Sequence, residues 1–253
     1  MTPYDLTWFI LFTILAEVFG TVGGFGSSVY FVPMASYFLD FHTVLGITAL
    51  YHLSSNISKI GFFRQGIDRG LLLYLGLPAV VLVALGAWAS RYVGSMWLGV
   101  GLGVFLLAFS LWMLANRDLG LRPNRKNALA GGALSGFAAG LLGTGGAIRG
   151  AVMTAFNLQK EKFVATSAVI DLGIDLSRTL VYARNGYIHN HDLYLVPILI
   201  VISILGTFAG KKILDRISQD QFRRIVLFLL LAIALFTLAV HGPGLWNGRA
   251  GPG

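Results

Sequence analysis

G-T-V-G-G-F-G-S-S at residues 20–28 and G-L-L-G-T-G-G-A-I-R at residues 140–149 are the two stretches from which the fold of this chain is predicted. Each stretch interrupts an apolar region and is followed by a short apolar segment, 28–40 in the first case and 147–158 in the second. As a helix, the second short segment would measure about 18 Å, whereas the hydrocarbon core of a bilayer is about 30 Å thick. Each stretch therefore predicts a helical hairpin that enters a membrane and turns at its glycines.

The same offset of 120 positions that separates the two stretches relates other residues along the chain. A constant offset over more than sixty positions predicts an internal duplication. We expect one membrane repeat over residues 1–120, a second over 121–242, and a flexible tail over 243–253. The coinciding residues are Gly20, Gly23 and Gly26 with Gly140, Gly143 and Gly146, Val44 with Val164, Arg64 with Arg184, Gly66 with Gly186, and Leu85-Gly86 with Leu205-Gly206.

The composition excludes an ordinary soluble domain. The chain has 253 residues, of which 56% are hydrophobic and only 12% charged, and its mean hydropathy is +0.74. Soluble proteins are about 25% charged. The 32 glycines suit membrane helices, because small residues let helix backbones approach closely. The absence of cysteine from the sequence excludes disulfide frameworks and thiolate metal sites.

Each predicted repeat contains five apolar segments. They are 5–22, 28–40, 43–63, 70–90 and 96–115 in the first repeat, and 128–145, 147–158, 163–183, 192–211 and 222–241 in the second. A hairpin counts as either no crossing or two crossings, so each repeat crosses the membrane an odd number of times. The fold class predicted is an all-α polytopic membrane protein with two inverted-topology repeats, each a glycine-broken hairpin followed by three transmembrane helices.

The basic residues indicate the orientation in the membrane. With the N-terminus outside, thirteen of the nineteen Lys and Arg residues fall in cytoplasmic loops, while three fall outside and three within apolar segments. This bias matches the positive-inside rule. The net charge of +8 is then an orientation signal, and binding to nucleic acid is not expected. We predict a multi-pass protein of the cytoplasmic (inner) membrane with both termini extracytoplasmic.

The glycine turns are the predicted substrate site, because discontinuous helices place positively polarised helix N-termini near the middle of the membrane. Such N-termini bind anions. Ser27 and Ser28 would open the first short helix, as cap and as hydrogen-bond donor. The alternative is that the glycines serve only close helix packing. The candidate substrate-binding residues are Gly24, Gly26, Ser27, Ser28, Asn56, Lys59, Thr144, Gly145, Gly146 and Arg149.

Ionisable residues inside apolar segments are costly and therefore functional candidates. Positions i, i+4 and i+7 share one helix face. This spacing gives a polar stripe on segment 43–63 and another on segment 163–183, and we expect the two stripes to face each other or a shared cavity. The stripe residues are His52, Asn56 and Lys59 on the first segment and Asp171, Asp175 and Arg178 on the second. Three cations and three acids lie in the interior, which is neutral if they pair. Asp171 is interpreted as a proton carrier and Asp175–Arg178 as either a functional pair or a packing ion pair. The proton-coupling or ion-pair candidates are Glu17, His52, Asp171, Asp175 and Arg178.

The chain resembles the TauE/SafE sulfite-exporter family of membrane anion permeases over most of residues 8–242. The resemblance rests on the paired glycine turns, V-P at 32–33, G-T-G-G at 143–146, A-T-S at 165–167 and the duplication. The first turn departs from an unbroken glycine run, since it reads G-G-F-G. The resemblance implies transport of sulfite, sulfonates or related sulfur-containing organic anions.

The resulting hypothesis is a secondary transporter of small sulfur-containing anions, with export the expected direction and alternating access between the repeats. The anion is either coupled to protons or moves down its own gradient. Its partners are the anion and the lipid bilayer, and the chain could form a homodimer. No cofactor, metal or enzymatic activity is expected, and the Walker motif is absent from the sequence.

Two alternatives stay open. A cation or metal permease would use the intramembrane acids and histidine, and an intramembrane serine hydrolase would use Ser27 or Ser28 with His52. His189 and His191 beside Asp192 form an H-x-H motif that can bind metal, but we interpret them as solvated loop residues.

Overall fold

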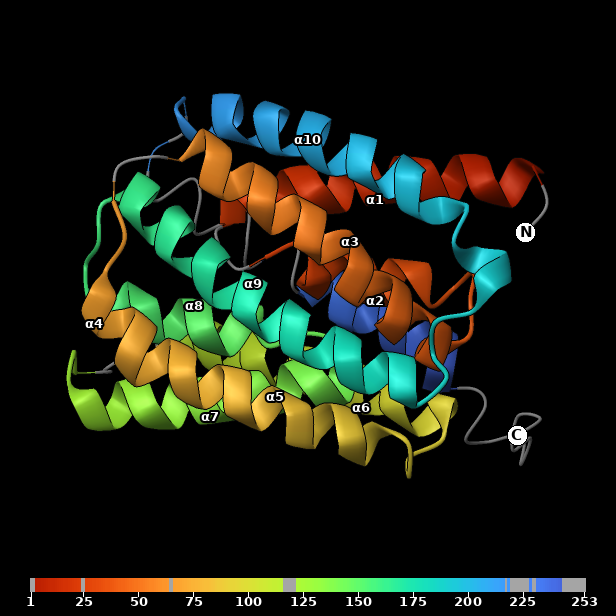
Figure 1. Cartoon of the computed structure of the whole chain (residues 1–253), viewed down its shortest axis with the longest axis horizontal. Helices are drawn as coiled ribbons and strands as arrows, with labels where there is room; N and C mark the ends of the chain where they lie inside the picture. Colours follow the sequence, from red (N-terminus) through yellow and green to blue (C-terminus); the bar gives the residue numbers. More distant parts are fainter. Residues whose placement is uncertain are drawn as a thin grey trace.

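The computed structural model describes residues 3–23, 26–63, 66–115, 122–216, 218, 228 and 231–242, and every regular element in this part of the chain is helical (Figure 1). The all-α fold class is therefore confirmed, whereas the predicted tail lies outside the described residues. A short apolar helix spans Leu231–Gly242. The other elements are α1 (Pro3–Gly23), α2 (Ser28–Ala35), α3 (Phe41–Phe62), α4 (Arg69–Leu71), the π-helical turn η1 (Leu72–Gly76), α5 (Leu77–Ser90), α6 (Ser95–Ala115), α7 (Arg125–Leu142), α8 (Gly146–Thr154), α9 (Lys160–Arg184), the 3-10 turn η2 (Asn190–Asp192) and α10 (Leu195–Leu214).

Both glycine stretches interrupt the helix. α7 ends at Leu142, and the next residue, Gly143, has φ of 78°, the left-handed conformation in which glycine commonly closes a helix. Gly26, just before α2, has φ of 89°. The short helices are shorter than expected, because α2 ends at Ala35 and α8 at Thr154. Apolar composition did not reveal these ends, since the turns that follow also contain apolar residues.

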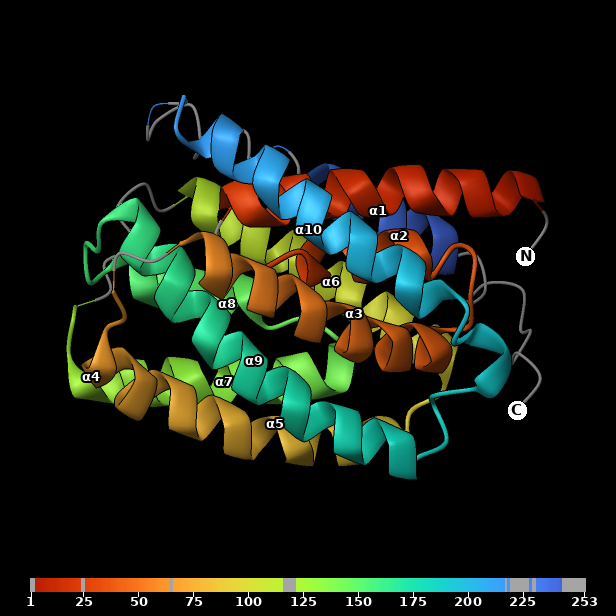
Figure 2. The same ribbon diagram turned by 45° about the horizontal axis from the view of Figure 1, so that its top comes forward.

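α1 and α10 lie side by side in both views (Figures 1 and 2). Gly206 of α10 lies against Glu17 of α1, and Gly210 against Thr21, so the two helices run parallel. A Cβ at either glycine would crowd the facing side chain, which shows how close the two helices are.

α5 and α7 form the opposite layer, and they also run parallel. Gly132 of α7 faces the carbonyl oxygen of Leu75, in the π-helical turn that leads into α5, and Gly136 faces that of Ala79. A Cβ at either glycine would overlap the facing carbonyl, so the backbones are in direct contact. This is the small-residue packing of membrane helices.

α3 and α9 cross between these two layers, as Figure 2 shows. Asn56 of α3 hydrogen-bonds Asp175 of α9, and Gly46 lies against Tyr187 beyond the end of α9, so the two helices are antiparallel. In Figure 1, α1, α3 and α10 run from right to left, whereas α5, α7 and α9 run from left to right. The helices with polar stripes therefore face each other, as expected.

The packing partners of the two predicted repeats correspond. α1 packs on α10 as α7 packs on α5, α3 packs on α10 as α9 packs on α5, and α3 packs on α9. Gly66 and Gly186, which are 120 positions apart, both have positive φ. Two inverted repeats that pack against each other would give this correspondence, because swapping one repeat for the other leaves the list of contacts unchanged. The duplication itself stays a prediction.

Four helices of the described part are long and apolar enough to cross a membrane. They are Pro3–Gly23, Arg69–Ser90, Ser95–Ala115 and Leu195–Leu214. The central helices α3 and α9 have 22 and 25 residues but are not among them. Their polar stripes lower their mean hydropathy, and these stripes form the site described below.

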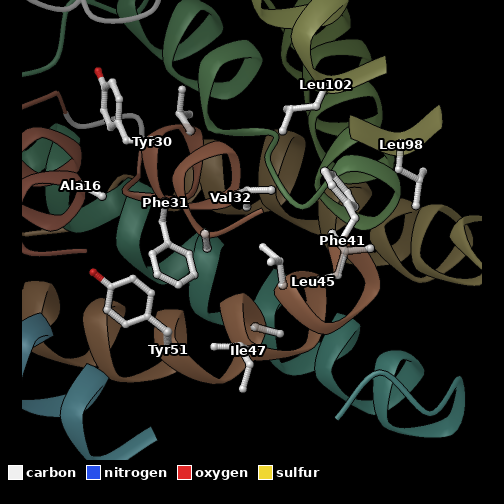
Figure 3. Close-up of a cluster of buried hydrophobic side chains, with 14 of the residues drawn as sticks. Ala16, Tyr30, Phe31, Val32, Phe41, Leu45, Ile47, Tyr51, Leu98 and Leu102 are labelled. Carbon is white, nitrogen blue, oxygen red and sulfur yellow. The ribbon is translucent and has the colours of Figure 1, made fainter. Parts of the chain in front are cut away.

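An apolar cluster holds the first hairpin in place (Figure 3). Phe31 and Val32 of α2 point toward Tyr51 and Leu45 of α3, and the rings of Phe31 and Tyr51 are 4.8 Å apart. Leu98 of α6 borders the same cluster. The cluster fixes α2 against α3 and thereby sets the position of the glycine turn that precedes α2.

Candidate functional site

The two glycine turns meet inside the bundle. Ser28, at the start of α2, donates a hydrogen bond of 3.3 Å to the hydroxyl of Thr144 in the second turn. A cavity beside the first turn has a volume of about 10 Å³, which is roughly the space for one water molecule. As lined by the described residues, this cavity is too small for a sulfite ion. The cavity is lined by Gly20, Gly26, Asn56, Lys59, Val164, Ser167, Ala168 and Asp171.

Arg149 of α8 binds Asp171 of α9 in the interior. Both terminal nitrogens of the guanidinium contact the carboxylate, one oxygen each, which is the bidentate arrangement. The Arg149 Nε donates to Ser167 at 3.2 Å. Gly26 lies beside this pair, because a Cβ there would be 3.5 Å from Asp171 and 3.6 Å from Arg149. Asp171 is thus paired with a cation from a neighbouring helix.

Lys59 of α3 pairs with Glu17 of α1 at 2.8 Å, and the Glu17 side chain is fully buried. Five hydroxyl groups besides Lys59 donate to the two oxygens of Glu17, so neighbours from several helices hold this acid. Glu17 therefore joins α1, α2, α3 and α10 as an ion-pair centre. Besides Lys59, the donors are Thr21 at 3.3 Å, Ser27 at 2.8 Å, Tyr51 at 2.5 Å, Ser55 at 2.7 Å and Thr207 at 2.9 Å.

Arg178 and Asp175 form the intrahelical pair that was one of the two interpretations, at 2.7 Å. Asp175 also accepts from Asn56 at 2.7 Å. In addition, Arg178 donates to the carbonyls of Gly143 at 2.8 Å and Ala139 at 3.2 Å. The last carbonyls of a helix have no N–H partner within the helix, and the guanidinium supplies one here. A cation at the C-terminal end of a helix also complements the helix dipole. Arg178 thus caps α7, a role that the sequence analysis missed.

Ser27 and His52 lie together, as the hydrolase alternative requires. Ser27 Oγ is 3.3 Å from His52 Nε2, but the hydroxyl donates to Glu17 at 2.8 Å. In a nucleophile–base–acid relay the acid hydrogen-bonds the histidine, and the histidine accepts the proton of the serine. Here Glu17 instead accepts the hydrogen bond of Ser27 directly, so the three residues are not arranged as such a relay. Ser27 is the N-cap residue of α2, as expected, but its hydroxyl makes no hydrogen bond to the helix N-terminus.

Comparison with known proteins identifies the family. The sequence matches the family described as "Sulfite exporter TauE/SafE" over residues 9–237. The chain belongs to the TauE/SafE family. It is also 25% identical over 250 residues to a protein of Methanocaldococcus jannaschii named "Probable membrane transporter protein", covering 89% of this chain and 91% of that relative. No solved structure gives a significant match.

The TauE/SafE chain is thus a multi-pass membrane transporter, as the resemblance implied. Membership in a transporter family is consistent with the expectation that it is not an enzyme. A cation permease would need an acid facing a cavity. Among the described intramembrane acids, Asp171 alone lines the cavity, and it is bound to Arg149.

The remaining candidate glycines of this TauE/SafE protein differ in where they lie. Gly146 begins α8, and Gly145 packs so closely on α7 that a Cβ would overlap the carbonyl of Ser135. Gly24 lies outside the described residues. Ser55 and Ser167, which were missed, each lie four residues before an identified ionisable residue, so helical spacing could have found them.

Proposed function

We propose that this TauE/SafE protein is a secondary transporter of small sulfur-containing anions such as sulfite or organosulfonates, with export across the cytoplasmic membrane as the expected direction. The observation that carries the proposal is the bidentate contact between Arg149 and Asp171 beside the glycine turns. The name of the family, which refers to sulfite export, supports the substrate class.

A sulfite or sulfonate group can replace the Asp171 carboxylate at Arg149. Two oxygens on one sulfur accept two parallel N–H bonds from a guanidinium, as two carboxylate oxygens do. Lys59 and Asp171 line the same cavity. An anion that enters beside Asp171 would therefore lie near a second cation in addition to Arg149. In this structure Asp171 occupies the position at Arg149 that the anion would take.

Exchange at Arg149 links the anion to a proton. An ionised Asp171 competes with the anion for the guanidinium, whereas a protonated Asp171 does not neutralise it. Leaving Arg149 buried beside a neutral Asp171 is costly, so the anion and the proton favour each other's binding. We expect the two to move in the same direction.

Alternating access requires the cavity to open, because its present volume of about 10 Å³ holds no anion. The site lies where the first turn meets α8 and α9, between the set α1, α3 and α10 and the oppositely directed set α5, α7 and α9. A rocking motion of one set against the other would expose Asp171 to either side in turn.

Flux in proteoliposomes tests the proposal. Methanesulfonate is the better substrate probe, since its charge does not change with pH, and sulfite is the second. We expect saturable uptake by the wild type and at least a tenfold loss in Arg149→Ala, because truncating one member of a buried charge pair costs about 2–5 kcal/mol. Lys162→Ala is the control, as Lys162 pairs with Asp68 outside the cavity at 3.1 Å.

Two outcomes contradict the proposal. The first is an absence of saturable flux for every sulfur anion in the wild type, with protein that is folded and inserted. The second is Arg149→Ala flux equal to that of Lys162→Ala, which would show that the anion does not use this guanidinium.

A further inference from the structure

His189, His191 and Asp192 lie together in the connection between α9 and α10, away from the cavity. One ligand atom from each of the three residues lies within 4.8 Å of the other two. Asp192 Oδ2 is 3.6 Å from His189 Nδ1 and 3.3 Å from His191 Nε2. The two imidazole rings are nearly parallel, with an angle of 26° between their planes.

The burial of the Asp192 carboxylate is the observation that points to a bound ligand. The residue is only 6% exposed, and its buried Oδ2 has no hydrogen-bond partner within the described part of the chain. The two histidine nitrogens are close to this oxygen, yet neither makes a hydrogen bond with it. A buried polar atom without a partner is costly and rare in folded proteins.

We propose that His189, His191 and Asp192 bind one late first-row divalent metal ion, with Zn²⁺ the best fit. Bonds of about 2.0–2.2 Å to nitrogen and oxygen in tetrahedral geometry place neighbouring ligand atoms roughly 3.3–3.6 Å apart. Both distances to Asp192 Oδ2 fall in this range. An ion there would supply the missing partner of the carboxylate.

The donor set selects the class of metal. Two imidazoles and one carboxylate favour zinc, copper or nickel, whereas magnesium and calcium prefer oxygen ligands alone. The His191 side chain is 78% exposed, so an ion can reach the site from solvent. Three protein ligands leave a fourth position for water or another ligand.

The surrounding contacts hold the connection in place before any ion binds. Asn185 donates to the carbonyl of Ala87 at 2.9 Å, and the Tyr187 hydroxyl is 3.1 Å from that of Ser90. The hydroxyl of Thr43 is 3.4 Å from His189 Nδ1, a long hydrogen bond that the metal would replace.

Calorimetric titration of the purified full chain with Zn²⁺ tests the site. The protein must carry no polyhistidine tag, which would itself bind the ion. We expect one ion per chain and at least a tenfold loss of affinity in His191→Ala. His191 is exposed, so this variant should fold. Asn190→Ala, an exposed neighbour in the same turn, should bind like the wild type.

Titration with Co²⁺ reports the geometry separately, since a tetrahedral site gives intense visible absorption and an octahedral one gives weak bands. Intense bands that disappear in Asp192→Asn support the site, and Mg²⁺ should not bind. The absence of stoichiometric Zn²⁺ binding, or equal affinity in wild type and His191→Ala, would overturn the proposal. Neither outcome depends on whether the chain transports sulfur anions.

Discussion

At the scale of single residues, three cations are buried in the described part of the bundle, and each one is paired with its own acid. Lys59 with Glu17 and Arg149 with Asp171 join different helices, whereas Arg178 with Asp175 lies within α9. A buried pair is weak evidence of stability, but breaking one by removing a single partner is strongly destabilising. The pairs therefore make distinct predictions when one member is changed.

Glu17→Gln should destabilise the protein by about 3 kcal/mol, because Lys59 would be left buried beside a neutral amide. The double variant Glu17→Gln/Lys59→Met should recover part of the loss, since it removes the unpaired charge. Thermal unfolding in detergent, followed by tryptophan fluorescence, measures both. A double variant less stable than Glu17→Gln would contradict the role of Glu17 as an ion-pair centre.

At the scale of elements, the contact between α5 and α7 depends on glycine. Gly136→Ala places a methyl group on the carbonyl of Ala79, so the helices must move apart at a cost of about 1–3 kcal/mol. Gly61→Ala on α3 is the matched control, because open space surrounds that position. It should be neutral or stabilising by up to about 1 kcal/mol. Equal melting temperatures for the two variants would be inconsistent with this packing.

The aspartate at the start of α4 should make the stability of the fold depend on pH. The backbone N–H of Leu71 donates to Asp68 at 3.0 Å, and this bond, aided by Lys162, holds the pKa of the Asp68 carboxyl below its ordinary value. A lowered pKa means that ionised Asp68 stabilises the fold at neutral pH, and that this contribution disappears as pH falls through the folded-state pKa.

Asp68→Asn should therefore unfold at a lower temperature than the wild type at neutral pH, with the difference closing in acid. Asparagine caps a helix about as well as aspartate, so the comparison isolates the charge. Melting curves at several pH values measure it, and a difference that does not change with pH would exclude this role of the ionised carboxyl.

At the scale of the whole molecule, the two helix sets run in opposite directions, so the ends of α5 and α10 lie at opposite ends of the bundle. Because the chain has no cysteine, a single introduced thiol reports the side on which it lies. In intact cells, a membrane-impermeant maleimide should label Arg91→Cys but not Arg216→Cys. Permeabilised cells should label both. The reverse pattern would contradict an extracytoplasmic N-terminus.

Much of this architecture could be predicted, because hydrophobic segments and the 120-residue offset are both visible in sequence. The facing stripes of α3 and α9 followed from helical spacing. The partners of Arg149 and Lys59 did not follow, because both residues pair with acids on other helices. The burial of Asp192 could not be predicted either, because it depends on how a loop packs against segments that are distant in the sequence.

Proton movement during sulfonate transport by Asp171→Asn tests most directly whether this acid couples the anion to a proton. Proteoliposomes containing a pH-sensitive dye are given a methanesulfonate gradient with the membrane potential clamped, and Asp68→Asn is the matched acid-to-amide control. Wild type and Asp68→Asn should carry protons with the anion. Asp171→Asn should still exchange labelled for unlabelled sulfonate, with no proton movement and no pH dependence. Proton movement in Asp171→Asn equal to that of the wild type would show that Asp171 does not carry the proton.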